Sequence, residues 1–172
     1  MSEYLRLYQP GGSYFFTVVI HQRFKILSQP GNIFRLHSAF HKVIKKHPFT
    51  LEAFVILPDH IHCIWRMPSR DSNYSIRWRL IKSNFSGGLN HPVNKRGEKD
   101  IWQRRFWEHL LRDEEVWRRH MDYIHYNPVK HGYVNKPGDW PHSFFQQAMK
   151  EGLHAPYWGA EVPVGISGMD LE

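Results

Sequence analysis

Two histidines are the first residues of this chain whose spacing could support chemistry. His60 and His62 stand two apart in a stretch with strand character, so both side chains should project from one face of a strand. Neutral imidazole is a common ligand for divalent metals. Taken alone, the motif favours two structural histidines, because it is short and the chain has 13 histidines.

A tyrosine and an asparagine form the second candidate pair. Asp113 is suited to cap a helix in which apolar residues recur at helical spacing. Tyr123 and Asn127 stand four apart on that helix and should share one face, and Pro128 is expected to end regular helix just after Asn127. Alone, the two residues are an ordinary amphipathic pair. Facing a histidine pair on a strand, they would be parts of a metal-assisted nuclease with a tyrosine nucleophile.

Several segments resemble a known family in the expected order. His60-Ile61-His62 resembles the His-hydrophobic-His core of the HUH endonucleases, and residues 123–132 resemble the tyrosine helix of single-tyrosine HUH transposases. The chain is specifically similar to the REP-associated tyrosine transposases, REP denoting a repetitive extragenic palindromic element. Four further segments agree, namely residues 11–18, 77–82, 102–109 and 139–143.

The resemblance implies a site and a reaction. His60, His62 and the Asn127 side-chain oxygen would hold one divalent ion, and nitrogen and oxygen ligands without a thiolate suit Mg²⁺ or Mn²⁺. Tyr123 would attack a phosphodiester of single-stranded DNA, forming a 5′-phosphotyrosine and releasing a 3′-hydroxyl. Tyr126 falls on another helix face, and His120 is interpreted as a packing residue.

The substrate that the resemblance implies is an imperfect DNA hairpin with a short single-stranded tag at its base. No small-molecule cofactor is expected, and either a monomer or a homodimer is compatible with one tyrosine. Two alternatives stay open. One is a nicking enzyme similar to the HUH relaxases and replication initiators, and the other is a non-catalytic protein that binds hairpin DNA.

Composition agrees with a nucleic-acid partner and limits the other classes. The 23 Lys and Arg residues against 16 Asp and Glu give a net charge of +7, which favours a polyanion, although a merely basic protein has the same balance. Cys63 is the sole cysteine, so no disulfide framework exists. Residues 1–4 lack the features of a signal peptide, and no apolar run reaches membrane-span length. We therefore expect a bacterial cytoplasmic protein, associated with the nucleoid.

The order of predicted elements is βαββαβα, an α+β fold with a ferredoxin-like antiparallel sheet. The resemblance implies the same fold, with the histidine pair on a central strand. Residues 1–150 are predicted to form the single domain, and residues 151–172 an irregular C-terminal tail. The strands are expected at residues 14–20, 49–57, 61–67 and 101–111, and the helices at residues 32–46, about 74–85 and from 114 to Asn127.

Basic residues near aromatic ones are candidates for contacts to DNA. On the second helix Trp78 is expected in the core, which leaves neighbouring basic side chains exposed. Two arginines on the last strand should alternate between its faces. Basic residues contact phosphates with little positional precision, and a solvated face is the alternative. The candidates are Arg77, Arg79, Lys82, Arg104, Arg105 and, within the tyrosine-helix motif, Lys130.

Overall fold

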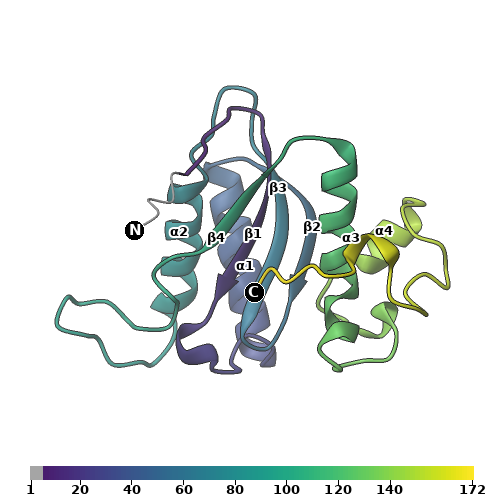
Figure 1. Ribbon diagram of the computed structural model, residues 1–172. Helices are drawn as coiled ribbons and strands as arrows, with labels where there is room; N and C mark the ends of the chain where they lie inside the picture. The colour runs from purple at the N-terminus through teal and green to yellow at the C-terminus, as the bar shows by residue number, and fades with distance from the viewer. Residues whose placement is uncertain (1–5) are drawn as a thin grey trace.

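The computed structural model describes residues 6–172, and a four-stranded antiparallel sheet forms its centre (Figure 1). The predicted element order and the ferredoxin-like fold are confirmed, and the histidine pair lies on an internal strand, since the strand order is β2-β3-β1-β4. The strands are β1 Ser13–Val19, β2 Thr50–Ile56, β3 His60–Arg66 and β4 Trp107–Leu111.

Helices cover the two faces of the sheet unequally. Helices α1 (Pro30–Lys46) and α2 (Tyr74–Gly87) lie behind the sheet in Figure 1 and enclose the main core with it. Ile61, Cys63 and Trp65 of β3 point into that core, as strand alternation predicts. Helix α3 (Glu114–Lys130) packs on the other side, where Ile64 belongs to a second, smaller core. His60 and His62 share this second face.

Side-chain caps define where α2 and α3 begin, and the cap at Asp113 is the predicted one. The Asn73 side chain accepts a hydrogen bond from the Ile76 amide at 3.1 Å. The Asp113 carboxylate accepts one from the Val116 amide at 2.8 Å. Each cap satisfies an amide that lacks a partner within its own helix.

The predicted end of the tyrosine helix was wrong. Helix α3 continues through Pro128 to Lys130. Proline removes one amide donor, but the backbone beyond it remains well bonded: the His131 amide donates to the Asn127 carbonyl at 3.0 Å, and the Tyr133 amide donates to the Pro128 carbonyl at 2.9 Å. Lys130 therefore lies two helical turns after Tyr123.

The last strand is shorter than predicted. β4 covers only Trp107–Leu111, because residues 101–106 meet the sheet through a single bridge between Trp102 and Ile20. Arg104 and Arg105 consequently lie outside the strand and are both exposed. The expected alternation of these two arginines between strand faces does not occur.

The chain beyond α3 returns to the sheet. It forms the short helices η2 (Pro137–Asp139), α4 (Phe145–Lys150) and η3 (Val164–Ile166), and its yellow end in Figure 1 crosses from α3 toward β3. The domain boundary at residue 150 stays a prediction. No helix in residues 6–172 is long and apolar enough to cross a membrane. The prediction about a signal peptide in residues 1–4 falls outside the described residues.

Candidate active site

The two histidines of β3 are buried side by side. Their ring centroids lie 4.7 Å apart, and both side chains are fully enclosed. Each Nε2 atom is buried without a hydrogen-bond partner in the described part of the chain. Each Nδ1 atom, in contrast, has a partner, and those partners determine which nitrogen carries the proton.

Thr17 selects the tautomer of His62. Its hydroxyl lies 2.9 Å from Nδ1 of His62 and donates its only hydrogen to the Leu171 carbonyl at 2.7 Å. The hydroxyl must then accept from Nδ1–H of His62, which leaves the lone pair on Nε2. Burial lowers the pKa of His62 well below its ordinary value, and the neighbouring His60 adds to this effect. His62 thus presents a neutral nitrogen ligand.

Asp59 selects the tautomer of His60 in the same way. Its Oδ1 lies 2.7 Å from Nδ1 of His60, and a carboxylate can only accept there. Burial alone would raise the pKa of Asp59, but hydrogen bonds from His60 and Arg23 outweigh it and lower the pKa to about 2. A carboxylate behind a metal-binding imidazole is a common supporting arrangement, because it orients the ring and fixes its tautomer.

The turn that delivers Arg23 to Asp59 is strained. Gln22 and Arg23 adopt φ angles of 52° and 53°, a left-handed conformation that residues other than glycine rarely adopt. The Arg23 guanidinium donates to Asp59 Oδ2 at 3.1 Å. The strained backbone is thus that of Arg23, whose guanidinium holds the Asp59 carboxylate behind His60.

Tyr123 faces this pair from α3. Its ring centroid lies 5.3 Å from that of His62, and the residue is only 1% exposed. The Lys130 ammonium donates to the phenolic oxygen at 3.2 Å, and the phenol donates to Glu172 Oε1 at 3.4 Å. Burial raises the pKa of Tyr123 above its ordinary value, although Lys130 acts in the opposite direction. In this arrangement the phenol is neutral.

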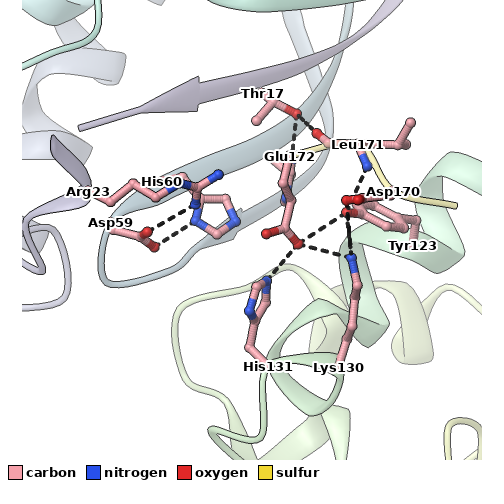
Figure 2. Close-up of polar contacts among 11 residues, drawn as sticks. Thr17, Arg23, Asp59, His60, Tyr123, Lys130, His131, Asp170, Leu171 and Glu172 are labelled. Atoms are coloured by element: carbon pink, nitrogen blue, oxygen red, sulfur yellow. Dashed lines mark hydrogen bonds and ion pairs between the residues drawn. The ribbon is translucent and has the colours of Figure 1, made fainter. Parts of the chain in front are cut away.

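Glu172 projects between the histidines and Lys130, as Figure 2 shows. Its Oε1 accepts from Lys130 at 3.0 Å and from His131 at 2.7 Å. Burial favours the neutral acid, but these two partners outweigh it and lower the pKa of Glu172. His60, His62 and Glu172 each offer a ligand atom, and the three atoms lie within 4.8 Å of one another. The group has the composition of a metal site.

Asn127 completes the buried polar set on α3. It follows Tyr123 by one helical turn and is fully buried. Neither polar atom of its side chain has a hydrogen-bond partner within residues 6–172. Leaving both atoms unsatisfied is costly, so the amide suits a ligand that the protein alone does not supply. Imidazole nitrogens with amide or carboxylate oxygens fit a divalent cation.

The structure corrects the prediction for Arg77. This residue is 1% exposed and donates to the carbonyls of His47, Pro48 and Asn73, and to Asp71 at 2.7 Å. Its guanidinium satisfies carbonyl groups where α1 ends and α2 begins. Arg77 is therefore buried and structural, and its predicted exposure was wrong.

Lys82 is also less exposed than predicted. Its ammonium donates to the Gln103 carbonyl at 2.9 Å, and burial lowers its pKa to about 8. Arg79 is exposed, but it lies on α2, on the face of the sheet opposite Tyr123. Of the predicted basic residues, Lys130 reaches the site, whereas Arg104 and Arg105 are exposed in the segment before β4.

Two further predictions concern α3. Tyr126 lies away from the histidines, against Trp158, with ring centroids 6.4 Å apart. His120 is buried, bonds the Val116 carbonyl through Nδ1 at 2.7 Å and stacks on His109, as a packing residue should. Sequence reasoning missed four groups at the site, which are Thr17, Asp59, His131 and Glu172. Asp59 alone had a local signal, because it directly precedes His60.

Comparison with known proteins agrees with this geometry. A family model described as "Transposase IS200 like" matches residues 10–127. The chain is 43% identical to the REP-associated tyrosine transposase of Escherichia coli strain K12, over 94% of this chain and 93% of that protein. It also matches the solved structure of a REP-associated tyrosine transposase bound to a REP hairpin, with 43% identity, a TM-score of 0.83 and coverage of 95% of this chain and 94% of that one. The chain therefore belongs to the IS200-like transposase family, among the REP-associated tyrosine transposases.

Proposed function

We propose that this protein is a divalent-metal-dependent endonuclease and strand transferase that cuts and rejoins single-stranded DNA at REP-type hairpins. One observation carries the proposal. The Tyr123 ring lies 5.3 Å from that of His62, and in both His60 and His62 the Nδ1 atom has a hydrogen-bond partner while the buried Nε2 atom has none in residues 6–172. Metal-assisted phosphodiester transesterification requires a nucleophile beside side chains that can bind a metal ion, here the two imidazoles.

The metal ligands that we propose are His60, His62 and the Asn127 side-chain oxygen, and Glu172 offers a further carboxylate oxygen close to the two histidines. All four residues bring donor atoms that a Mg²⁺ or Mn²⁺ ion accepts, and the Nε2 atoms of His60 and His62 and the Asn127 side-chain oxygen are buried without a hydrogen-bond partner in residues 6–172. When bound, the ion would polarise the scissile phosphate and stabilise the charge that develops on it.

Tyr123 is the proposed nucleophile. Its phenolic oxygen bonds to phosphorus, the bond from phosphorus to the 3′-oxygen breaks, and the leaving oxygen takes up a proton as a 3′-hydroxyl. The DNA is left attached through a 5′-phosphotyrosine, and attack by another 3′-hydroxyl reverses the step, so rejoining needs no external energy source. An ordinary tyrosine is only about one part in a thousand phenolate at neutral pH. Lys130 supports the phenolate because its ammonium already bonds the phenolic oxygen.

Glu172 marks where a phosphate would bind. Its carboxylate is an anion held by Lys130 and His131, directly beside the Tyr123 hydroxyl. A DNA phosphate has the same sign of charge and the same kind of acceptor oxygens. Since Tyr123 is buried beneath residues 171 and 172, DNA must displace these residues before attack.

A hairpin with an unpaired tag is the substrate that we propose. The related transposase was solved on a REP hairpin, and this chain carries a net charge of +7. Phosphate contacts supply affinity without sequence information, whereas an unpaired strand exposes its base edges. A tyrosine on a rigid helix also needs a phosphate that can bend toward it, which an unpaired segment provides.

The decisive experiment is a cleavage assay on a matched pair of DNAs with Mn²⁺ or Mg²⁺. One DNA is a hairpin with its single-stranded tag, and the other has the same sequence annealed into full duplex. We expect a covalent protein–DNA adduct with the tagged hairpin only, and none after EDTA treatment. Equal cleavage of the duplex would instead indicate a general metal nuclease.

The Tyr123→Phe variant provides the matched control for the nucleophile. It removes the hydroxyl and keeps the ring that packs near Phe15 and His62. We expect unchanged hairpin binding in a gel shift and no adduct on a denaturing gel. A normal yield of adduct would move the nucleophile elsewhere, and Tyr126→Phe would be tested next.

A further inference from the structure

Trp107 stands out among the seven tryptophans of the chain. It is 38% exposed, whereas the other six are buried or partly buried. It begins β4, which is an edge strand of the sheet. An isolated exposed apolar residue needs no explanation, so its position relative to the site decides whether it matters.

The strand register places Trp107 in the same row as the candidate site. Thr17 of β1 pairs with His62 on one side and with Trp107 on the other. Residues directly opposite each other share a face of the sheet. Neighbouring strands lie about 4.8 Å apart, so the Trp107 backbone lies about 10 Å from that of His62. Phe15 confirms the shared face, because its ring centroid lies 5.7 Å from that of Trp107 and 5.4 Å from that of His62.

Other aromatic rings support the indole. Trp107 and His109 are nearly parallel, with an interplanar angle of 3° and centroids 5.7 Å apart. His109 in turn stacks on His120 of α3, at 5.2 Å and 15°. Phe15 meets the indole edge-on at 72°. These contacts hold the indole in place, so binding a flat partner costs little side-chain entropy.

The surroundings of Trp107 suit a polyanion with flat groups. Arg104 and Arg105 are exposed just before β4, and Arg112 is exposed just after it. An exposed indole with exposed arginines before and after its strand is complementary to single-stranded DNA, whose bases stack while its phosphates are neutralised.

We propose that Trp107 is a stacking platform for one unpaired base of the DNA tag, next to the phosphate that Tyr123 attacks. The inference rests on the proposed function and adds a binding contact to it. Every base has a flat face, so this contact supplies affinity for unpaired DNA and places the strand without reading its sequence.

Binding measurements test the platform in a Tyr123→Phe background, which prevents turnover. Removal of one stacking aromatic costs about 1–3 kcal/mol per base, so Trp107→Leu should bind the tagged hairpin about 5- to 150-fold more weakly. Affinity for the same hairpin without its tag should not change. Trp107→Phe should retain most of the affinity, because it keeps a flat ring. The matched control is Phe34→Ala, which removes an aromatic that is 76% exposed on α1, on the opposite face of the sheet.

A fluorescent base reports the stacking directly. With 2-aminopurine placed at each tag position in turn, we expect quenching at one position and its loss in Trp107→Leu. Unchanged quenching and affinity in that variant would overturn the inference, and so would equal weakening on tagged and untagged hairpins. The proposed function fails separately, through absence of the Tyr123 adduct, so the two failures can be told apart.

Discussion

Replacing Thr17 by valine should weaken metal binding without touching a metal ligand. The Thr17 hydroxyl has two partners, the buried His62 Nδ1–H and the partly buried Leu171 carbonyl. Valine keeps the branched shape and removes the acceptor for Nδ1–H. The tautomer that leaves Nε2 free then has an unsatisfied buried N–H, which costs about 1–3 kcal/mol. That cost corresponds to about 5- to 150-fold weaker binding of Mn²⁺, and loss of similar supporting groups elsewhere costs about 10- to 100-fold.

Two measurements check this expectation. Calorimetric titration with Mn²⁺ gives the affinity, and ¹⁵N spectra of the histidine rings in the metal-free protein report which His62 nitrogen carries the proton. Thr17→Ser should behave like the wild type because it keeps the hydroxyl. Thr50→Val makes the same substitution at an exposed strand position and should have no effect. Wild-type affinity in Thr17→Val would refute the argument that this hydroxyl prepares His62.

The other perturbations probe two groups at the site and one buried histidine elsewhere in the domain. Asp59→Asn should lower Mn²⁺ affinity by about 10- to 100-fold in the same titration, because the carboxylate behind His60 is lost; an unchanged affinity would show that Asp59 has only a structural role. A chain ending at residue 169 should form the adduct faster, since Tyr123 loses its cover, and an equal or slower rate would contradict this. For His154, burial lowers the pKa to about 4, so the unfolded state takes up a proton first as pH falls below about 6.5. The contribution of His154 to the free energy of unfolding should therefore fall by about 1 kcal/mol from pH 7 to pH 5, after allowing for screening. Denaturant titrations at the two pH values measure this decrease, and His154→Gln should lose it.

Local patterns predicted the parts of the site that local geometry determines. Strand alternation separates His60 and His62 from Ile61 and Cys63, and the structure places the two sets on opposite faces of the sheet. The cap at Asp113 and the helical spacing likewise predicted a helix on which Tyr123 faces the sheet, as the structure has it. These features depend on neighbours within a few residues, so one sequence contains enough information to predict them.

The incorrect and missing predictions share a different cause. Arg77 looked like a surface cation, yet its partners include the carbonyls of His47 and Pro48, about 30 positions earlier in the chain. Glu172 reaches Lys130 and His131 from more than 40 positions away. No periodicity links residues at such separations, because only the packing of distant segments brings them together.

The continuation of α3 past Pro128 changes the interpretation of Lys130. A helix ending at Asn127 would have left Lys130 as one basic surface residue among several. Two further turns of helix from Tyr123 instead bring its ammonium to both the phenol and Glu172. One cation is thus shared between Tyr123 and an anion that covers it. While Glu172 is bound, it screens part of the positive charge that would favour the phenolate, and burial keeps the phenol neutral. A phosphate that displaces Glu172 would uncover Tyr123 and take over the anion position beside Lys130, so access to Tyr123 would depend on this exchange.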